Sequence, residues 1–297
     1  MDIKKKERQM TQKIFYSEKQ STTSNSSFSP SAGKPQELVK AVRNLKIPVE
    51  ITRPHLVAER EDFYTVHDRD FVDSILDGLS SNGFGNKIKE VNQTLKYTTG
   101  ALLSAADYAY FNKAITCAPV SGFHHAGHAY CGGFCTFNGL LVTAHYLQKK
   151  YKAKVAIIDL DQHYGDGSVD IIKKLNLSSF ITHYTFGQFG ITSQSAEKWL
   201  KGLYDELYQV CKNANIILYQ AGADPHINDP LGGVLTTEQM KQRDEIVFSI
   251  AKKLDLPLSW VLAGGYQTPL QKVLSIHLNT LTQSLKTFGR DKDSHTN

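Results

Sequence analysis

The sequence has few cysteines and no long apolar run. Only four of its 297 residues are cysteine, Cys117, Cys131, Cys135 and Cys211, too few and too scattered for a disulfide framework, so we expect buried free thiols. No apolar run approaches the roughly 18 residues of a membrane span, and the N-terminus lacks the apolar stretch of a secretory signal. These absences predict a cytoplasmic protein without a membrane partner.

A strong excess of one charge is also missing. The 34 basic and 29 acidic residues leave a net charge of +5, part of which comes from the cluster Lys4-Lys5-Lys6. Such a cluster is typical of a solvated tail, so we expect no nucleic-acid partner. An apolar fraction of 41% supports a globular protein, and the length is near the upper limit for one hydrophobic core. We therefore expect one α/β domain with long loops.

From residue 155 onward, short β-branched runs alternate with segments of helical period. The runs cover residues 155–158, 180–183, 216–219 and 260–262, and the helical segments cover residues 168–175, 196–212, 236–254 and 269–285. Thr236 and Gln239 have the spacing of a capping box. This alternation is typical of right-handed βαβ units. It predicts an α/β fold of three layers, a mostly parallel sheet flanked by helices.

The first half of the chain is richer in helical pattern. Amphipathic segments predict helices at residues 35–45, 68–76 and 95–111, and apolar runs predict strands at residues 13–16 and 115–120. Residues 17–34 are rich in Ser and Thr, which is compatible with a flexible linker and equally with an ordered surface loop. Both interpretations stay open.

Polar or glycine-rich motifs follow four of the predicted strands. They are His124-His125, the run from Asp159 to Gly167, Asp224, and Gly264-Gly265-Tyr266. Ligands of open α/β sheets bind at the edge where strands end. Asp161 and His163 are two residues apart on one extended stretch, so their side chains should point the same way, and Asp224 follows another strand. The three residues predict a metal site, and three protein ligands leave a coordination position for water. The alternative is a buried polar network without metal, but unpaired buried carboxylates are costly.

A hydrolytic metal site also needs a base and a donor for the developing oxyanion. The tandem histidines and Tyr266 fit these roles. Asp159 and Asp166 flank the metal ligands in sequence, and we predict that their carboxylates orient the histidines. Five other histidines are expected to be structural or solvated: His55, His67, His145, His226 and His277. His128 stays open, because it lies near the predicted site in the sequence.

These motifs resemble the zinc-dependent histone deacetylase family, which includes bacterial acetylpolyamine amidohydrolases and has the arginase-like fold. The resemblance covers about residues 35–273 and rests on the tandem histidines, Gly133-Phe134, the Asp-x-Asp-x-His-x-Gly-Asp-Gly run, Ala223-Asp224, Asp229 to Gly233 and Gly-Gly-Tyr. We predict a short bacterial-type member. Its predicted parts are a basic tail over residues 1–12, one deacetylase-like catalytic domain over 13–288 and a C-terminal tail over 289–297.

The resemblance implies roles for the residues at the strand ends. It implies Zn²⁺ on Asp161, His163 and Asp224, with His125 as general base, His124 as its electrostatic partner and Tyr266 polarising the scissile carbonyl. Fe²⁺ and Co²⁺ also suit a site of carboxylates and imidazole.

The resemblance also implies two further features. Gly133 and Phe134 would line a tunnel for the acylated chain. A structural K⁺ would be held by the backbone around Asp159, Asp161 and His163, with a hydroxyl from the next strand, for which Thr182 is the candidate. Residues 25–34 are expected either to fold over the mouth of the site or to form a linker, and residues 82–86 to form the facing rim.

The chain departs from the family pattern at three places. Tyr164 stands where relatives have a second histidine, and Gly122-Phe123 where they have Pro-Gly. A long segment with a Phe-Pro-Gly-Thr-Gly stretch after the third strand is absent, because residues 183–193 lead directly into a helix. We expect Phe186 or Phe189 to replace the tunnel wall that this segment supplies.

The predicted function is that of a metal-dependent amidohydrolase. It would remove an acetyl or other acyl group from an N-acyl lysine, a polyamine or a small acylated amine by attack of a metal-bound water. An arginase-type ureohydrolase is one alternative, but it requires an Asp where Gly165 stands, and the acid comes one residue later at Asp166. A non-catalytic acyl-ligand binding protein is the other. Neither the substrate nor the oligomeric state follows from the sequence.

Overall fold

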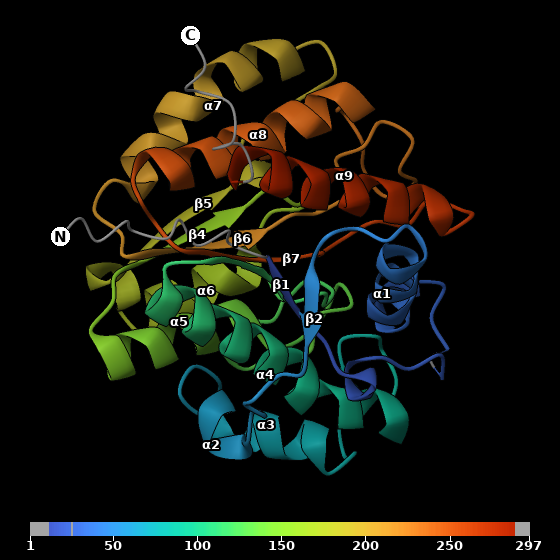
Figure 1. The fold of residues 1–297 in the computed structure, drawn as a ribbon. Helices are drawn as coiled ribbons and strands as arrows, with labels where there is room; N and C mark the ends of the chain where they lie inside the picture. The colour runs from blue at the N-terminus through green and yellow to red at the C-terminus, as the bar shows by residue number, and fades with distance from the viewer. Residues whose placement is uncertain (1–11, 25, 289–297) are drawn as a thin grey trace, which may run out of the picture.

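The computed structural model describes residues 12–24 and 26–288. The fold of these residues is built on a parallel sheet (Figure 1). Its strands are β1 Lys13–Phe15, β2 Glu50–Thr52, β3 Ile115–Cys117, β4 Val155–Asp159, β5 Ile181–Thr185, β6 Ile216–Gln220 and β7 Leu258–Val261. In the described part they form one seven-stranded sheet of order β2-β1-β3-β7-β6-β4-β5, and every neighbouring pair is parallel. The parallel sheet predicted from the alternating pattern is confirmed.

Helices cover both faces of the sheet. They are α1 Lys34–Asn44, α2 Arg60–Phe63, α3 Arg69–Leu76, α4 Lys89–Asn112, α5 Gly139–Tyr151, α6 Asp166–Lys174, α7 Ala196–Cys211, α8 Thr237–Lys253 and α9 Gln271–Phe288. One core lies between the sheet and α1, α7, α8 and α9, and the other between the sheet and α3 to α6 (Figure 1). No helix of this described part has the length and apolarity needed to cross a bilayer.

Successive strand residues supply the two cores in turn. Ile158 and Tyr219 belong to the core under α7 to α9, whereas their neighbours Ile157 and Leu218 belong to the core over α4 to α6. This is the two-residue period of a strand whose two faces are both buried. The three-layer arrangement predicted from the sequence is therefore confirmed.

Three elements were absent from the sequence prediction, and α4 begins six residues earlier than predicted. The largest omission is α5, in which Gly139 to Ala144 are all buried. A helix buried on most sides has no polar stripe and therefore no clear 3.6-residue period. The short edge strand β2 and the four-residue helix α2 are too brief to give a pattern.

The Ser-rich segment is ordered where the structure describes it. Ser17 caps a short 3₁₀ helix, the backbone N–H of Thr22 donates to the Ala32 carbonyl at 2.9 Å, and the Ser121 hydroxyl donates to the Ser31 carbonyl at 2.6 Å. Hydroxyl side chains thus serve as caps and turn formers rather than as linker residues. Of the two interpretations, the ordered loop is the one the structure supports.

The predicted tails can be compared with the structure at one residue only. Residues 1–11 and 289–297 lie outside the described residues. Gln12, which the prediction placed in the N-terminal tail, is buried and accepts a hydrogen bond from the Ser284 hydroxyl of α9 at 2.6 Å. The domain boundaries otherwise stay a prediction.

Candidate metal centre

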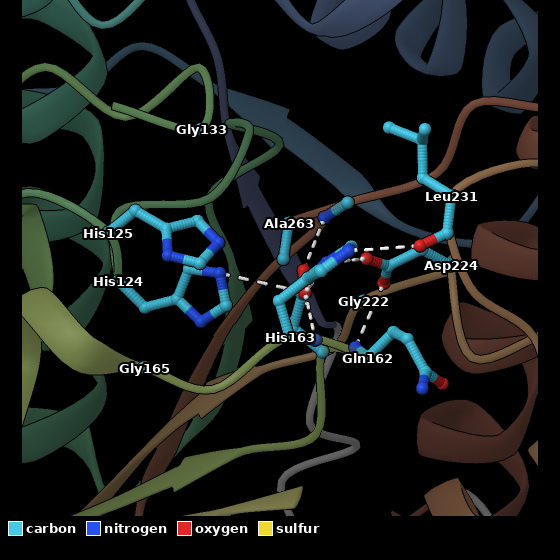
Figure 2. A network of polar contacts seen from close by, with 12 residues as sticks. His124, His125, Gly133, Gln162, His163, Gly165, Gly222, Asp224, Leu231 and Ala263 are labelled. Carbon is cyan, nitrogen blue, oxygen red and sulfur yellow. Dashed lines mark hydrogen bonds and ion pairs between the residues drawn. The ribbon is translucent and has the colours of Figure 1, made fainter. Parts of the chain in front are cut away.

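The three predicted metal ligands lie together at the carboxyl edge of the sheet. Asp161 and His163 follow β4, and Asp224 follows the neighbouring strand β6. One ligand atom from each residue lies within 4.8 Å of the other two. The Nδ1 atom of His163 is 3.2 Å from an Asp161 oxygen and 3.0 Å from an Asp224 oxygen. Figure 2 shows His163 with Asp224 on one side and the tandem histidines on the other.

The imidazole of His163 is oriented from behind by a backbone group. Its Nε2 atom donates to the carbonyl oxygen of Leu231 at 3.0 Å. Hydrogen bonds to Asp161 and Asp224 raise the pKa of His163 to about 11, so a proton on Nδ1 occupies the point where imidazole and carboxylates meet. A divalent ion at that point would replace this proton, and one nitrogen with two carboxylates is a ligand set that suits Zn²⁺.

The two carboxylates also favour a cation between them. Asp161 and Asp224 are both buried, with exposed fractions of 2% and 0%. Burial, followed by the negative charge of Asp161, raises the pKa of Asp224 to about 7. A bound divalent ion removes both causes of that shift, since it neutralises the pair and replaces the lost solvation. The residues present therefore fit a divalent metal.

Gly264 leaves the room that the two carboxylates occupy. Its backbone N–H donates to Asp161 Oδ2 at 2.8 Å. A Cβ atom at this position would lie 2.4 Å from Asp224 Oδ2 and 2.7 Å from Asp161 Oδ2. The first glycine of the Gly-Gly-Tyr motif is thus required by the close approach of the backbone to both predicted ligands.

The tandem histidines differ in charge because they have different surroundings. His124 is buried and its Nδ1 lies 2.7 Å from Asp159 Oδ2. Burial by itself would lower the pKa of His124, but Asp159 and Asp161 outweigh it and hold the pKa at about 9. His125 donates from Nδ1 to Asp166 at 2.6 Å, and burial together with the charge of His124 lowers its pKa. Of the two imidazoles, His125 is therefore the one that is more readily neutral.

Tyr266 follows β7 and lines the same small cavity as His124 and Asp161. Its backbone N–H donates to Asp229 Oδ2 at 2.8 Å. Burial, and then the charges of Asp224 and Asp161, raise the pKa of Tyr266 well above its ordinary value. The phenol is therefore a neutral hydrogen-bond donor at any physiological pH.

A group of aromatic rings lies around Phe134, which lines the small cavity beside Asp161 and Tyr266. Gly133 and Phe134 both have left-handed backbone, with φ of 52° and 64°, and this turn brings the Phe134 ring to the centre of the group. Phe134 lies 5.5 Å from Phe28, 5.7 Å from Phe84 and 5.5 Å from Tyr266, measured between ring centroids. We call Phe28, Phe84, Phe134 and Tyr266 the entrance aromatics.

Neither phenylalanine that was predicted to replace the tunnel wall belongs to the entrance aromatics. Phe186 is buried in the core against Trp199 of α7, and Phe189 packs on Tyr184. Both follow β5 on the side of the sheet covered by α7. The rings that pack on Phe134 come instead from residues 26–29 and 82–86, through Phe28 and Phe84.

The hydroxyl predicted beside the Asp159 loop is not that of Thr182. Thr182 is exposed, and its hydroxyl donates to the Val210 carbonyl of α7 at 2.9 Å. The buried Thr185 pairs with Asp159 in the sheet, and its hydroxyl accepts from the Gly165 N–H at 3.0 Å. The prediction failed because β5 extends two residues beyond the predicted strand, so a later residue reaches the sheet edge.

Lys34 is a site residue that the sequence prediction missed. It is the first residue of α1 and is completely buried, and its ammonium group donates to the carbonyls of Ala263 and Gly264. Burial lowers its pKa to about 8, although Asp224 and Asp161 act in the opposite direction. No signal in the sequence distinguishes this lysine from a solvated one.

The space left at the site is small. A cavity of about 10 Å³ lies among Ser31, Phe134, Asp161 and Tyr266, which is room for about one water molecule. A neighbouring cavity of about 50 Å³ shares Ser31 and Phe134 with it. A separate cavity of about 530 Å³ lies between α2, α3 and α4, and none of the predicted site residues lines it.

Comparison with known proteins agrees with this geometry. The family profile described as histone deacetylase domain matches residues 30–189 and 188–281. An uncharacterized protein of Picosynechococcus sp. is 25% identical over 252 residues, which cover 77% of this chain and 83% of that protein.

Two relatives with descriptive names match over shorter stretches. Histone deacetylase 2 of Arabidopsis thaliana is 27% identical over 181 residues, 54% of this chain and 47% of the plant protein. The acetoin utilization protein AcuC of Staphylococcus aureus strain MRSA252 is 31% identical over 140 residues, 42% of this chain and 36% of the staphylococcal protein. These two matches span less than half the length of either relative.

Proposed function

The chain belongs to the histone deacetylase family, and on this premise we propose that it is a metal-dependent amidohydrolase. Its substrate would be an N-acyl lysine, an acylated polyamine or a small acylated amine, from which it removes an acetyl or other acyl group. The observation that carries the proposal is the convergence of Asp161, His163 and Asp224 within 4.8 Å at the ends of two adjacent strands. The family profile and the name of the Arabidopsis relative support a hydrolase of the deacetylase type.

The metal we propose is Zn²⁺, with Fe²⁺ and Co²⁺ as ions that the same ligands accept. When bound by Asp161, His163 and Asp224, such an ion supplies Lewis-acid activation of a water molecule and of the amide carbonyl.

The tandem histidines would move the protons of the reaction. His125 accepts a proton from the attacking water at Nε2, because its Nδ1–H is committed to Asp166. As the water oxygen bonds to the carbonyl carbon and the C–N bond breaks, the same imidazolium returns the proton to the leaving amine. His124, kept charged by Asp159, stabilises the negative charge that develops beside it. The products are a carboxylic acid, which keeps the second proton of the water, and a free amine; in solution the two ionise to carboxylate and ammonium.

Tyr266 and the entrance aromatics would hold the substrate. The neutral phenol of Tyr266 donates to the carbonyl oxygen as that oxygen gains charge. The rings of Phe28, Phe84 and Phe134 present an apolar surface to the chain that links the amide to the rest of the substrate. An unbranched aliphatic stem, as in lysine and polyamines, fits such a surface.

The experiment is to measure acetate release from acetyl-lysine peptides and acetylpolyamines by zinc-loaded protein. We expect release that stops on treatment with a chelator, returns with zinc and is lost in Tyr266→Phe. A protein that binds one zinc but releases no acyl group from any of these substrates would contradict the proposal and indicate a binding protein. Release of urea from guanidino compounds would indicate a ureohydrolase instead.

A further inference from the structure

Arg243 of α8 lies directly behind the candidate metal centre. Its exposed fraction is 0%, and its Nη1 atom donates to two backbone carbonyls, Leu160 at 3.1 Å and Gly222 at 2.7 Å. Leu160 immediately precedes Asp161, and Gly222, labelled in Figure 2, lies two residues before Asp224. One guanidinium nitrogen therefore joins the two strand exits that carry the predicted carboxylate ligands.

The position of Arg243 is set from the side away from the site. Its Nε atom donates to Asp244 Oδ1 at 2.9 Å, while Nη2 lies 2.8 Å from the same oxygen without hydrogen-bond geometry. Asp244 in turn accepts hydrogen bonds from the hydroxyls of Tyr219 and Thr280. Because a guanidinium is planar and rigid, a group anchored at Nε has little freedom at Nη1.

This arrangement opposes the repulsion between two carboxylates. Asp161 and Asp224 are buried and face each other across His163, whose Nδ1 lies between them, so any repulsion between the carboxylates that the imidazole does not offset acts on their strand exits. The two carbonyls held by Arg243 belong to those exits and cannot separate without breaking a charge-assisted hydrogen bond. The full positive charge of Arg243 also lies on the protein side of the same carboxylates.

We propose that Arg243 is a positioning residue that sets the spacing of Asp161 and Asp224 before a metal ion binds. The inference rests on the proposed metal-dependent function and extends it to a residue on α8 whose contacts are with the backbone and Asp244. Its effect should appear in metal affinity itself, because partners behind a ligand shell commonly change affinity by about 10- to 100-fold.

The test compares two variants of the same ion pair in the full chain. Arg243→Lys keeps the charge but loses the planar group in which Nε is anchored on Asp244 while Nη1 reaches both carbonyls. Asp244→Asn weakens the ion pair but keeps an oxygen that accepts from Nε, so Nη1 should stay on Leu160 and Gly222. Zinc dissociation constants are measured by competition with a chromophoric chelator, and melting temperatures on the metal-free proteins. We expect Arg243→Lys to raise the zinc Kd at least about tenfold. We expect Asp244→Asn to lower the melting temperature with the Kd changed less than about threefold.

Several results would overturn the proposal. A zinc Kd unchanged in Arg243→Lys would do so, as would an equal rise in Kd in Asp244→Asn, since that would trace the effect to general stability. Arg243→Gln serves as a second variant, and failure of both Arg243 variants to fold while Asp244→Asn folds would assign the residue to the fold alone. A wild-type protein that binds no zinc refutes the proposed function instead, so the two failures are distinguishable.

Discussion

His163 donates from Nε2 to the carbonyl oxygen of Leu231 at 3.0 Å, which directs Nδ1 toward the carboxylates of the candidate metal centre. The loop that carries Leu231 is itself held by Asp229. One oxygen of Asp229 accepts from the Leu231 N–H at 3.0 Å and the other from the Tyr266 N–H at 2.8 Å. A single carboxylate thus orients both a predicted metal ligand and the predicted oxyanion donor.

Asp229→Asn should therefore impair two properties together. The amide replaces one acceptor oxygen by a donor, so either the Leu231 or the Tyr266 N–H loses its partner. We expect the zinc Kd to rise and kcat to fall, each by about tenfold, in calorimetric titration and acyl-release assays. The exposed Asp205 of α7 supplies the control, because Asp205→Asn should change neither quantity. Loss of one property without the other would show that Asp229 supports only one of the two residues.

Tyr266→Phe should remove the donor to the carbonyl oxygen without removing the metal. Loss of one oxyanion donor commonly reduces kcat by about 10²-fold or more. The zinc Kd should remain near the wild-type value, since the phenol is absent from the predicted ligand set. Turnover equal to that of the wild type would exclude Tyr266 from the mechanism.

Gly264→Ala should weaken metal binding by steric conflict. The added Cβ would lie 2.4 Å from Asp224 Oδ2, so that carboxylate has to move away from Asp161. We expect the zinc Kd to rise by more than about tenfold in a competition assay. Gly202→Ala in α7 is the matched control, because a Cβ added there would lie 3.8 Å from Glu206 Oε1, an ordinary contact, and a helical alanine is favourable. Equal zinc affinity in both variants would contradict the close approach described for Gly264.

Phe28→Ala should weaken substrate binding more than turnover. Phe28 is 73% exposed and its ring contacts Phe134 and Tyr266, so we place it beside the substrate stem. We expect KM for acetyl-lysine peptides to rise by about three- to tenfold, with kcat within about twofold. Phe111 of α4 is 78% exposed and lies outside the entrance aromatics, so Phe111→Ala is the matched control. A rise in KM of the same size in both variants would remove Phe28 from the entrance.

Because His67 is buried as a neutral ring, we expect it to lower the free energy of unfolding of the protein in mild acid. Its Nδ1–H donates to the Gly127 carbonyl and its Nε2 accepts from the Asn138 N–H, both at 2.8 Å, so the folded state holds a neutral ring. Burial lowers the pKa of His67 to about 4, against about 6.5 in the unfolded chain. Between these values the unfolded state binds more protons, so the free energy of unfolding falls as the pH is lowered, by up to about 3 kcal/mol.

Urea unfolding between pH 7 and pH 4 measures this effect. His67→Gln keeps a donor and an acceptor but has no titrating group, and it should lose that part of the pH dependence which His67 contributes. The same slope of stability against pH in both proteins would show that other groups cause it.

The order of strands and helices after residue 155 was predictable because each element has its own local pattern of apolar and polar residues. The strands β4 to β7 are apolar and β-branched, and each was placed within two residues of its observed bounds. The capping box of Thr236 and Gln239 marks the start of α8 in both sequence and structure. The helix α5 was not predictable by the same means, since burial on most sides removes the periodic contrast.

The candidate ligands were predictable because of where they stand in the chain. Asp161, His163 and Asp224 directly follow buried strands, and adjacent parallel strands end at one edge. The hydroxyl beside the Asp159 loop was predicted at the wrong residue, because the end of β5 depends on pairing with β4 rather than on local propensity.

The sequence by itself therefore determined the sheet type, the candidate ligand set and the tandem histidines, since periodicity and residue type at strand ends are local properties. Only the tertiary structure decided which rings form the entrance and where two buried cations lie. Lys34 reaches the carbonyl of Ala263 across 229 residues of chain, and Arg243 reaches that of Leu160 across 83. A charge becomes buried only where distant segments close around it and supply its hydrogen bonds, and no local pattern encodes that closure.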